Sequence, residues 1–275
     1  MTYNKSPLVS VGMPIYNSGE KLVAAIESII NQSYLNLEII ISDNHSSDNT
    51  PHICESYSNK NSKIKFYRQK ENIGAYENFQ FVLNKASGKY FMWAADDDIR
   101  SHDFIYQNLM ELEKSQSFVA STSPNRFLSE NSDIVDFDLD LDLDSRILRL
   151  LDNIWASHGV FYSLLRRDVA VNFDFSKTFI GFDWAFNLHL LSCGRIKRVK
   201  QGFLYLGSDG GSKQSNSWIK MANSNVQKYI PLFDFTISAC KIVKMKKTKS
   251  LLVFYFKLLR LNLTAIRSRY KLFIN

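Results

Sequence analysis

The sequence predicts an α/β fold, in which the strands of a sheet alternate with helical crossovers, within one large globular domain, and one observation carries each part of this prediction. Over roughly the first 120 residues, short runs rich in β-branched and aromatic residues alternate with amphipathic stretches at helical spacing. The chain has 275 residues, 45% of them hydrophobic and 22% charged, which suits one large globular domain or one domain with an appendage. This composition excludes a disordered chain and a small disulfide scaffold.

The elements of this first part follow one another in a regular order. A buried apolar run at 8–13 is the first strand, which Pro14 is expected to end, and apolar residues at helical spacing over 22–30 make the first helix. The later predicted elements are strands at 37–41, 63–67 and 89–93 and helices around 49–58 and 74–86. The middle of the chain is less regular, and from about residue 225 the chain is expected to be helical.

Loops rich in polar residues follow three of the predicted strands. These loops hold Pro14, Tyr16 and Asn17 after the first strand, residues 42–48 after the second, and Asp96, Asp97 and Asp98 after the fourth. In open α/β sheets, ligands bind where loops leave the carboxyl ends of the strands. These loops are therefore the expected place for chemistry.

Three consecutive aspartates at the end of an apolar strand indicate a cation site. Crowded carboxylates repel one another unless a cation or solvent compensates, and oxygen-only ligands suit Mg²⁺ or Mn²⁺. Asp98 or Ser101 could instead cap the following helix, but a cap explains one aspartate and not three.

Asp43 directly follows the second predicted strand, so its carboxylate would face the same crevice. A carboxylate can accept a hydrogen bond from the N3–H of uracil or thymine, and Tyr16 could offer an aromatic face to the base. Asp43 and Asp48 could instead be turn and capping residues. Guanine also presents N–H groups to a carboxylate, so the base stays open, with uracil preferred.

Six linked motifs, in one order over roughly residues 7–115, resemble the opening of glycosyltransferase family 2. They are the runs 9–17, 25–34 and 38–50, then Asn72-Ile73-Gly74 with Asn78, residues 86–90, and the Asp96-Asp97-Asp98 loop. Farther on, Gly181-Phe182-Asp183-Trp184 and Asp209-Gly210-Gly211-Ser212 resemble later motifs of the family more loosely.

The resemblance implies a GT-A fold, a Rossmann-like mixed sheet flanked by helices. It also implies transfer of a sugar from a nucleotide diphosphate donor to a hydroxyl, with inversion and with Mn²⁺ or Mg²⁺ on the diphosphate. The positions that match the family's donor-site residues are Pro14, Tyr16, Asn17, Asp43, Asn72, Gly74 and Asp96. Among them, the resemblance implies that Asp43 recognises the base and that Asp96 binds the ribose. By the same matching, Asp97 and Asp98 would hold the metal and Asp183 would be the general base.

Three positions depart from the family pattern. Ala95 stands where many relatives carry an aspartate, and Glu77 stands where a basic residue is common. Asp209 replaces a histidine that lies close to the metal in some relatives, and it remains a third candidate metal ligand because aspartate supplies suitable oxygen atoms.

The C-terminal region is strongly basic. From Gly211 onward there are thirteen Lys or Arg and one acid, Asp234, whereas the first 210 residues carry about −5. An amphipathic cationic helix of this kind could lie on an anionic membrane surface, or it could dock on the catalytic domain with its basic face in solvent. No nucleic-acid motif accompanies the charges, so a nucleic-acid partner is not expected.

An alternating run, Asp136 to Asp144 with an aspartate at every second position, would place its carboxylates on one face of a strand. Such a face could bind calcium, or it could be a solvated edge strand or loop.

Three widely spaced cysteines suggest neither disulfides nor zinc, and no secretory signal or membrane span is evident. We expect a cytoplasmic protein, peripheral at the inner face of the plasma membrane.

Its expected organisation is a glycosyltransferase domain over 1–224 (donor half 1–120, acceptor half 121–224) and a basic helical region over 225–275. The expected acceptor is a glycan or lipid-linked hydroxyl in bacterial surface polysaccharide synthesis, such as lipopolysaccharide O-antigen or capsule. A nucleotidyltransferase, which would need a Gly-rich phosphate loop, and a non-catalytic nucleotide-sugar or membrane-binding module are the alternatives.

Overall fold

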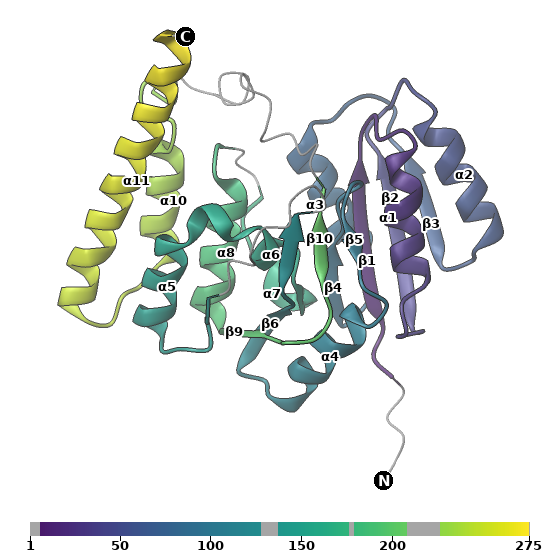
Figure 1. Cartoon of the computed structure of the whole chain (residues 1–275), viewed down its shortest axis with the longest axis horizontal. Coiled ribbons are helices and arrows are strands. Elements are labelled where there is room, and N and C mark those ends of the chain that lie inside the picture. Colours follow the sequence, from purple (N-terminus) through teal and green to yellow (C-terminus); the bar gives the residue numbers. More distant parts are fainter. Residues whose placement is uncertain (1–5, 128–136, 176–178, 208–225, 275) are drawn as a thin grey trace.

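A seven-stranded mixed sheet lies at the centre of the computed structural model, which describes residues 6–127, 137–175, 179–207 and 226–274 (Figure 1). Its strands, in spatial order, are β3 (Ile64–Arg68), β2 (Leu37–Asp43), β1 (Val9–Ile15), β4 (Tyr90–Trp93), β8 (Leu164–Arg166), β6 (Phe118–Thr122) and β9 (Arg195–Arg198). The first four are parallel to one another, whereas β8 runs antiparallel to both of its neighbours. The sheet is therefore mixed, as the resemblance implied.

A smaller sheet and a set of helices surround this centre. The small sheet has the order β5 (Ile99–Arg100), β10 (Leu204–Leu206) and β7 (Asn125–Phe127). The described helices are α1 (Lys21–Ile30), α2 (Thr50–Lys60), α3 (Ala75–Lys85), α4 (Phe104–Lys114), α5 (Leu143–Asp152), α6 (His158–Phe161), α7 (Arg167–Val171), α8 (Phe182–Cys193), α10 (Phe233–Ile242) and α11 (Thr248–Ile274), with a short 3₁₀ turn at Ile154–Ala156. None of them, within the described residues, combines the length and hydropathy needed to cross a bilayer.

The four strands and three helices predicted for the first part are confirmed, but the predicted end of the first strand at Pro14 is wrong. β1 continues to Ile15, whose carbonyl accepts a hydrogen bond from the Asn44 N–H on the β2 side at 2.9 Å. Because successive residues of a strand bond to opposite sides, the nitrogen of Pro14 faces β4. β4 pairs with β1 only over Val9–Gly12, so the N–H that proline lacks has no partner to lose.

The two faces of the main sheet bury two apolar cores. Along β2, Ile39 and Ile41 pack into the core beneath α1, α2 and α4, and Ile40 between them points into the other core. That second core continues through α3 and α8 to the C-terminal helices, where Phe235 and Phe254 are buried. α10 and α11 thus share a core with the main sheet; the predicted boundary at 224/225 lies outside the described residues.

Of the two readings of the alternating aspartates, the loop is confirmed and the common strand face is wrong, because residues 137–142 form no strand beyond one isolated bridge at Leu139 and helix α5 begins at Leu143. Asp136 lies outside the described residues, and each aspartate from 140 onward has its own role. Their partners are the Arg195 and Lys197 side chains for Asp140 (2.8 and 3.2 Å), the Ser145 N–H for Asp142 (3.3 Å), and the Lys246 and Lys247 N–H groups for Asp144 (2.8 and 3.0 Å). The run supplies caps and ion pairs instead of a common face.

Glu38, a buried carboxylate on β2, links this strand to its neighbours β1 and β3 through side-chain hydrogen bonds. It accepts hydrogen bonds from the Ser10 hydroxyl (2.6 Å), the Lys65 ammonium (2.7 Å) and the Ser87 N–H (2.7 Å). Burial raises the pKa of Glu38, but these hydrogen bonds outweigh it and lower the pKa to about 2. The ionised form therefore stabilises the fold above the ordinary glutamate range, and that contribution is lost as the pH falls toward 2.

We expect Glu38→Gln to lower the free energy of unfolding at pH 7 by about 2 kcal/mol, because the amide forfeits the charge-assisted bonds. Urea unfolding at several pH values measures this, and the gap between variant and wild type should close as the pH approaches the lowered pKa. Glu111→Gln is the matched control, since Glu111 pairs with Lys114 at the surface and should change stability by less than about 0.5 kcal/mol. A gap that does not vary with pH would contradict the assignment.

Candidate active site

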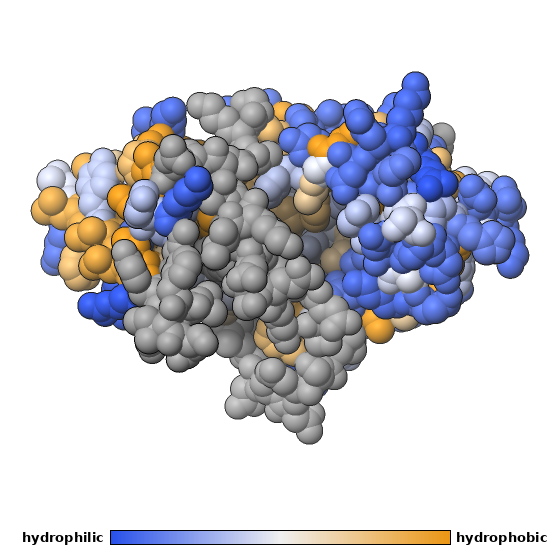
Figure 2. Space-filling model, turned by 90° about the horizontal axis from the view of Figure 1, so that it is seen from above, coloured by the Kyte–Doolittle hydropathy of each residue, from blue (hydrophilic) through white to orange (hydrophobic). Residues whose placement is uncertain are grey.

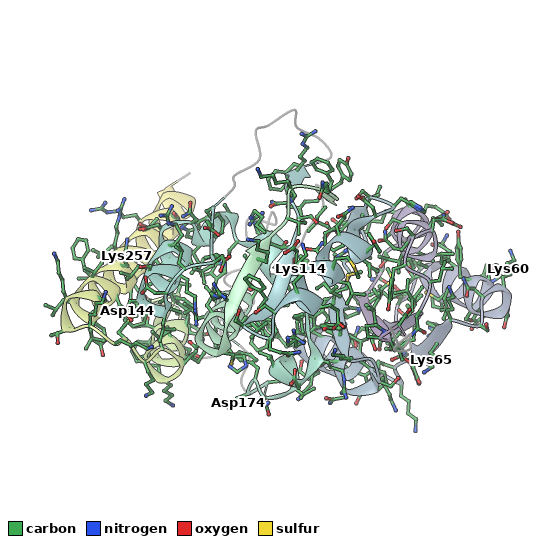
Figure 3. The ribbon with its side chains drawn as sticks, turned by 90° about the horizontal axis from the view of Figure 1, so that it is seen from below. Lys60, Lys65, Lys114, Asp144, Asp174 and Lys257 are labelled. Atoms are coloured by element: carbon green, nitrogen blue, oxygen red, sulfur yellow. The ribbon has the colours of Figure 1, made fainter. Side chains whose placement is uncertain are left out.

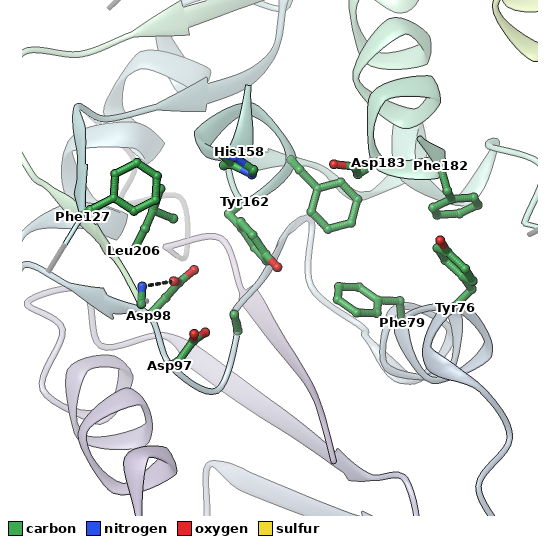
Figure 4. Close-up of a pocket in the computed structure, with 13 residues that line it drawn as sticks. Tyr76, Phe79, Asp97, Asp98, Phe127, His158, Tyr162, Phe182, Asp183 and Leu206 are labelled. Atoms are coloured by element: carbon green, nitrogen blue, oxygen red, sulfur yellow. Dashed lines mark hydrogen bonds between the residues drawn. The ribbon is translucent and has the colours of Figure 1, made fainter. Parts of the chain in front are cut away.

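A cavity of about 370 Å³ opens between the end of β4 and the N-terminus of α8 (Figure 4). Its walls come from distant parts of the chain and are mostly apolar or aromatic. The lining residues are Tyr76, Phe79, Ala95, Asp97, Asp98, Phe127, His158, Phe161, Tyr162, Phe182, Asp183, Leu206 and Gly207. Three carboxylates therefore face a space that is otherwise poor in charge.

Asp98 lies in the loop after β4 and is buried, with 3% of its surface exposed. Its Oδ1 accepts a hydrogen bond from the Gly207 N–H at 3.0 Å, and its Oδ2 has no hydrogen-bond partner among the described residues. Burial raises the pKa of Asp98 to about 6, although the nearby Arg100 guanidinium opposes the shift. A buried carboxylate oxygen without a partner is costly, and a ligand that fills this role would relieve the cost.

Asp97 and Asp98 fit a hard divalent cation. They are adjacent, they face one cavity, and the orphaned Oδ2 of Asp98 is an oxygen ligand of the kind that Mg²⁺ and Mn²⁺ prefer. Within the described residues, no group of three or more His, Cys, Asp or Glu side chains is arranged to hold a metal, and Asp209 lies outside those residues. Two carboxylates suffice where substrate phosphates and water complete the coordination, as is usual for Mg²⁺.

Asp183 faces the same cavity from the side opposite Asp97 and Asp98, with His158 and Tyr162 between them in the close-up (Figure 4). It stands in the first turn of α8, which Gly181 begins in a left-handed conformation at φ 84°. Desolvation raises the pKa of Asp183 above the ordinary aspartate value, and His158 partly opposes the shift. The carboxylate is thus a stronger base than one in open solvent.

Tyr162 completes the polar part of the cavity. Burial, with the charges of Asp98 and Asp97, raises its pKa well above the ordinary tyrosine value, so its hydroxyl stays protonated at neutral pH. The aromatic wall beyond it includes Tyr76 and Phe182, whose ring centroids are 4.7 Å apart. Such a wall provides flat apolar surface next to the carboxylates.

Asp43 does not line this cavity. Its carboxylate is fully buried at the end of β2, where it accepts hydrogen bonds from the Ser46 N–H (3.1 Å) and hydroxyl and lies 3.4 Å from Nε of Arg68. Tyr16, at the end of β1, is half exposed. These side chains therefore stand at the carboxyl edge of the sheet, beside the cavity and not in its wall.

The remaining predicted donor-site residues also lie at this edge and build its loops. Asn72 accepts hydrogen bonds from the Asn44 amide (2.9 Å) and the Gly74 N–H (3.0 Å), which fixes the turn before α3. Asn17 accepts one from the Ser47 N–H at 2.9 Å. Asp96 accepts one from the Ser18 hydroxyl and lies 3.6 Å from the Lys21 ammonium, and Pro14 is within β1.

Gly207, directly after β10, lies against the Asp97–Asp98 loop, and the sequence did not single it out. A Cβ atom there would lie 2.6 Å from the backbone oxygen of Asp97 and even closer to its carboxylate. No side chain fits between β10 and the Asp97–Asp98 loop. A single glycine carries no signal of this role, because the close approach joins residues more than 100 positions apart.

We expect Gly207→Ala to push Asp97 away, to weaken metal-dependent nucleotide binding about 10-fold or more, and to cost about 1–3 kcal/mol of stability through overpacking. Thermal melting with and without Mn²⁺ and nucleoside diphosphates measures both effects. Gly159→Ala is the control, since its nearest contact would be the Asn125 side-chain oxygen at 3.1 Å. Unchanged nucleotide binding in Gly207→Ala would show that Asp97 tolerates the added methyl group.

This mixed sheet flanked by helices is the fold of the GT-A glycosyltransferases. The family model for glycosyl transferase family 2 matches residues 10–171, so the chain belongs to that family. The predicted family is thus confirmed. The chain is 35% identical over 109 residues to glycosyltransferase GlyG of Streptococcus pneumoniae, a match that covers 38% of this chain and 36% of that protein. It is 34% identical over 116 residues to the putative glycosyltransferase EpsE of Bacillus subtilis, covering 42% of each. The chain spans about two fifths of the length of these curated relatives.

Solved structures confirm the GT-A fold. The mannosyltransferase PcManGT from Pyrobaculum calidifontis, in complex with GDP-Man and Mn²⁺, matches with a TM-score of 0.67 over 98% of this chain and 74% of that one. S. aureus TarS 1–349 in complex with UDP-GlcNAc matches with a TM-score of 0.62 over 91% and 79%. Both are 16% identical in sequence, so the likeness concerns the fold.

Proposed function

We propose that this chain is an inverting, metal-dependent glycosyltransferase that moves a sugar from a nucleotide diphosphate sugar to an acceptor hydroxyl. The observation that carries the proposal is the single cavity in which Asp97 and Asp98 face Asp183 across an aromatic-lined space. One side of this space suits a cation and a diphosphate, and the other side holds a base. A direct displacement needs both and needs no covalent nucleophile.

The proposed roles follow from the position of each group. Asp97 and Asp98 would hold Mn²⁺ or Mg²⁺, and a cation bound there would stabilise the charge that develops on the departing diphosphate. Asp183 would take the proton of the acceptor hydroxyl while the oxygen attacks the anomeric carbon from the face opposite the diphosphate. Attack from that face inverts the anomeric configuration.

The donor is proposed to be a UDP-sugar. The support is the position of Asp43 and Tyr16 at the carboxyl edge of β2 and β1, together with the UDP-GlcNAc complex of S. aureus TarS. Because both oxygens of Asp43 already accept hydrogen bonds from Ser46, binding of the uracil N3–H would have to displace or share one of them. GDP-Man, which PcManGT binds, is the competing donor class.

The acceptor is proposed to be a glycan or a lipid-linked hydroxyl, in the synthesis of a bacterial surface polysaccharide. Family membership and the basic C-terminal region support this choice. The acceptor would enter next to Asp183, where Tyr76 and Phe182 offer aromatic surface to a sugar ring.

Thermal stability of the purified protein tests the donor site. UDP, TDP, GDP and their sugar conjugates are each added with and without Mn²⁺, and we expect one nucleotide to raise the melting temperature only when the metal is present. A transfer assay with that sugar then tests turnover. The absence of any shift in folded protein would overturn the proposal, and binding without turnover in the presence of acceptor would favour a non-catalytic module.

A further inference from the structure

Helix α11 has two apolar faces, and only one of them packs against the rest of the protein. Phe254, Leu258, Leu261 and Ala265 are buried on the inner face. A second set, here called the outer stripe, follows the same helical spacing on the solvent side; its members are Leu252, Tyr255, Phe256, Leu259 and Leu263, which are between 46% and 67% exposed. Large side chains at this spacing form one continuous apolar band and not scattered exposed residues.

The inner face fixes the helix in place. Asp144 on α5 accepts the N–H groups of Lys246 and Lys247 just before α11, and Lys257 forms an ion pair with Asp152 at the end of α5. Figure 3 shows Lys257 and Asp144 at the same end of the molecule. Because α11 is held from within, the outer stripe keeps its orientation whether or not anything covers it.

Positive charge lies next to the outer stripe, before the helix and along one of its flanks. Residues 226–268 contain nine Lys or Arg and one acid, Asp234. The exposed cations on and next to the helix are Lys241, Lys244, Lys246, Lys247, Lys249, Arg260 and Arg267. From above, apolar and hydrophilic side chains lie next to each other at the end of the molecule where α11 stands (Figure 2).

We propose that the outer stripe of α11 docks on an anionic lipid bilayer, with the helix lying in the plane of the interface. Leu252, Phe256 and Leu259 would enter the boundary of the acyl chains, and the flanking cations would contact anionic head groups. A second copy of this chain fits less well, because α11 carries no acid and two such helices would repel each other. The inner face is docked on the protein, as one of the two alternatives from the sequence expected, and the proposal assigns the membrane alternative to the outer stripe.

Vesicle sedimentation of the whole chain tests the proposal, with vesicles of phosphatidylcholine alone and of phosphatidylcholine and phosphatidylglycerol in equal parts. We expect binding to the anionic vesicles only. The triple variant Leu252→Ser, Phe256→Ser, Leu259→Ser should weaken binding to the anionic vesicles by about 10-fold or more. The triple variant Lys244→Gln, Lys249→Gln, Arg260→Gln should weaken it about 100-fold at low salt.

The matched control replaces three apolar residues that are exposed elsewhere, Leu35→Ser, Tyr106→Ser and Val171→Ser, and should bind vesicles like the wild type. All variants change exposed side chains, so melting temperatures and metal-dependent nucleotide binding should stay unchanged, which separates this test from that of the transferase activity. Failure of the wild type to bind anionic vesicles would overturn the proposal. Concentration-dependent dimerisation that the outer-stripe variant abolishes, without vesicle binding, would assign the stripe to a second copy instead.

Discussion

Replacing Asp97 by alanine should reduce the rate of sugar transfer by about 1,000-fold, the equivalent of several kcal/mol of lost transition-state stabilisation. The reason is geometric, because Asp97 and the orphaned Oδ2 of Asp98 lie next to each other and offer oxygen ligands on one side of the cavity. Steady-state kinetics with Mn²⁺ measure the loss. A chelator should reduce the wild-type rate to a similar level.

The control for this variant is Asp138→Ala, which removes an exposed carboxylate far along the chain from the cavity loop. It should leave transfer unchanged. Excess Mn²⁺ should restore the chelated wild type but not Asp97→Ala. Full activity of Asp97→Ala, or no effect of the chelator, would refute the assignment of the metal site.

Replacing Asp183 by asparagine should reduce kcat about 100- to 10,000-fold, because the amide cannot accept the proton of the acceptor hydroxyl. Donor binding should survive, since Asp183 faces the cavity from the side opposite Asp97 and Asp98. The metal-dependent rise in melting temperature with nucleotide therefore separates the two variants. A wild-type rate in Asp183→Asn would require another base.

The pH dependence of transfer follows from the raised pKa of Asp183. The carboxylate must be ionised to act as a base, so kcat/KM should fall as the pH decreases through a value above the ordinary aspartate range. His158 opposes the rise, and His158→Gln should therefore shift the acidic limb to higher pH. An acidic limb that His158→Gln leaves in place would show that another group controls it.

Much of the fold could be predicted from local patterns. Buried runs such as 37–41 read as strands, and the polar loops after β1, β2 and β4 were placed correctly at one edge of the sheet. The end of β1 could not be predicted, because whether Pro14 breaks the strand depends on how far β4 extends beside it. The register between two strands depends on both of them, so it cannot be predicted from the sequence of either strand alone.

The candidate site was predictable where a family motif marks it and not elsewhere. Asp97, Asp98 and Asp183 were named from the sequence, and the structure brings them to one cavity. Gly207 and Phe127 could not be predicted as cavity residues, because they reach the cavity only through the folding of distant segments onto the Asp97–Asp98 loop. For the same reason the sequence could not divide the apolar residues of α11 into an inner face and an outer stripe.

The small sheet of β5, β10 and β7 makes the geometry of the Asp97–Asp98 loop depend on residues far along the chain. It joins strands at 99–100, 125–127 and 204–206, and its last strand leads directly to the Gly207 N–H that holds Asp98. The parallel strands β1 to β4 need only the first 93 residues, and their contacts are local by comparison. Asp98 can accept its hydrogen bond only once residue 207 has been synthesised, so we expect a growing chain to complete the cavity loop later than the edge of the sheet.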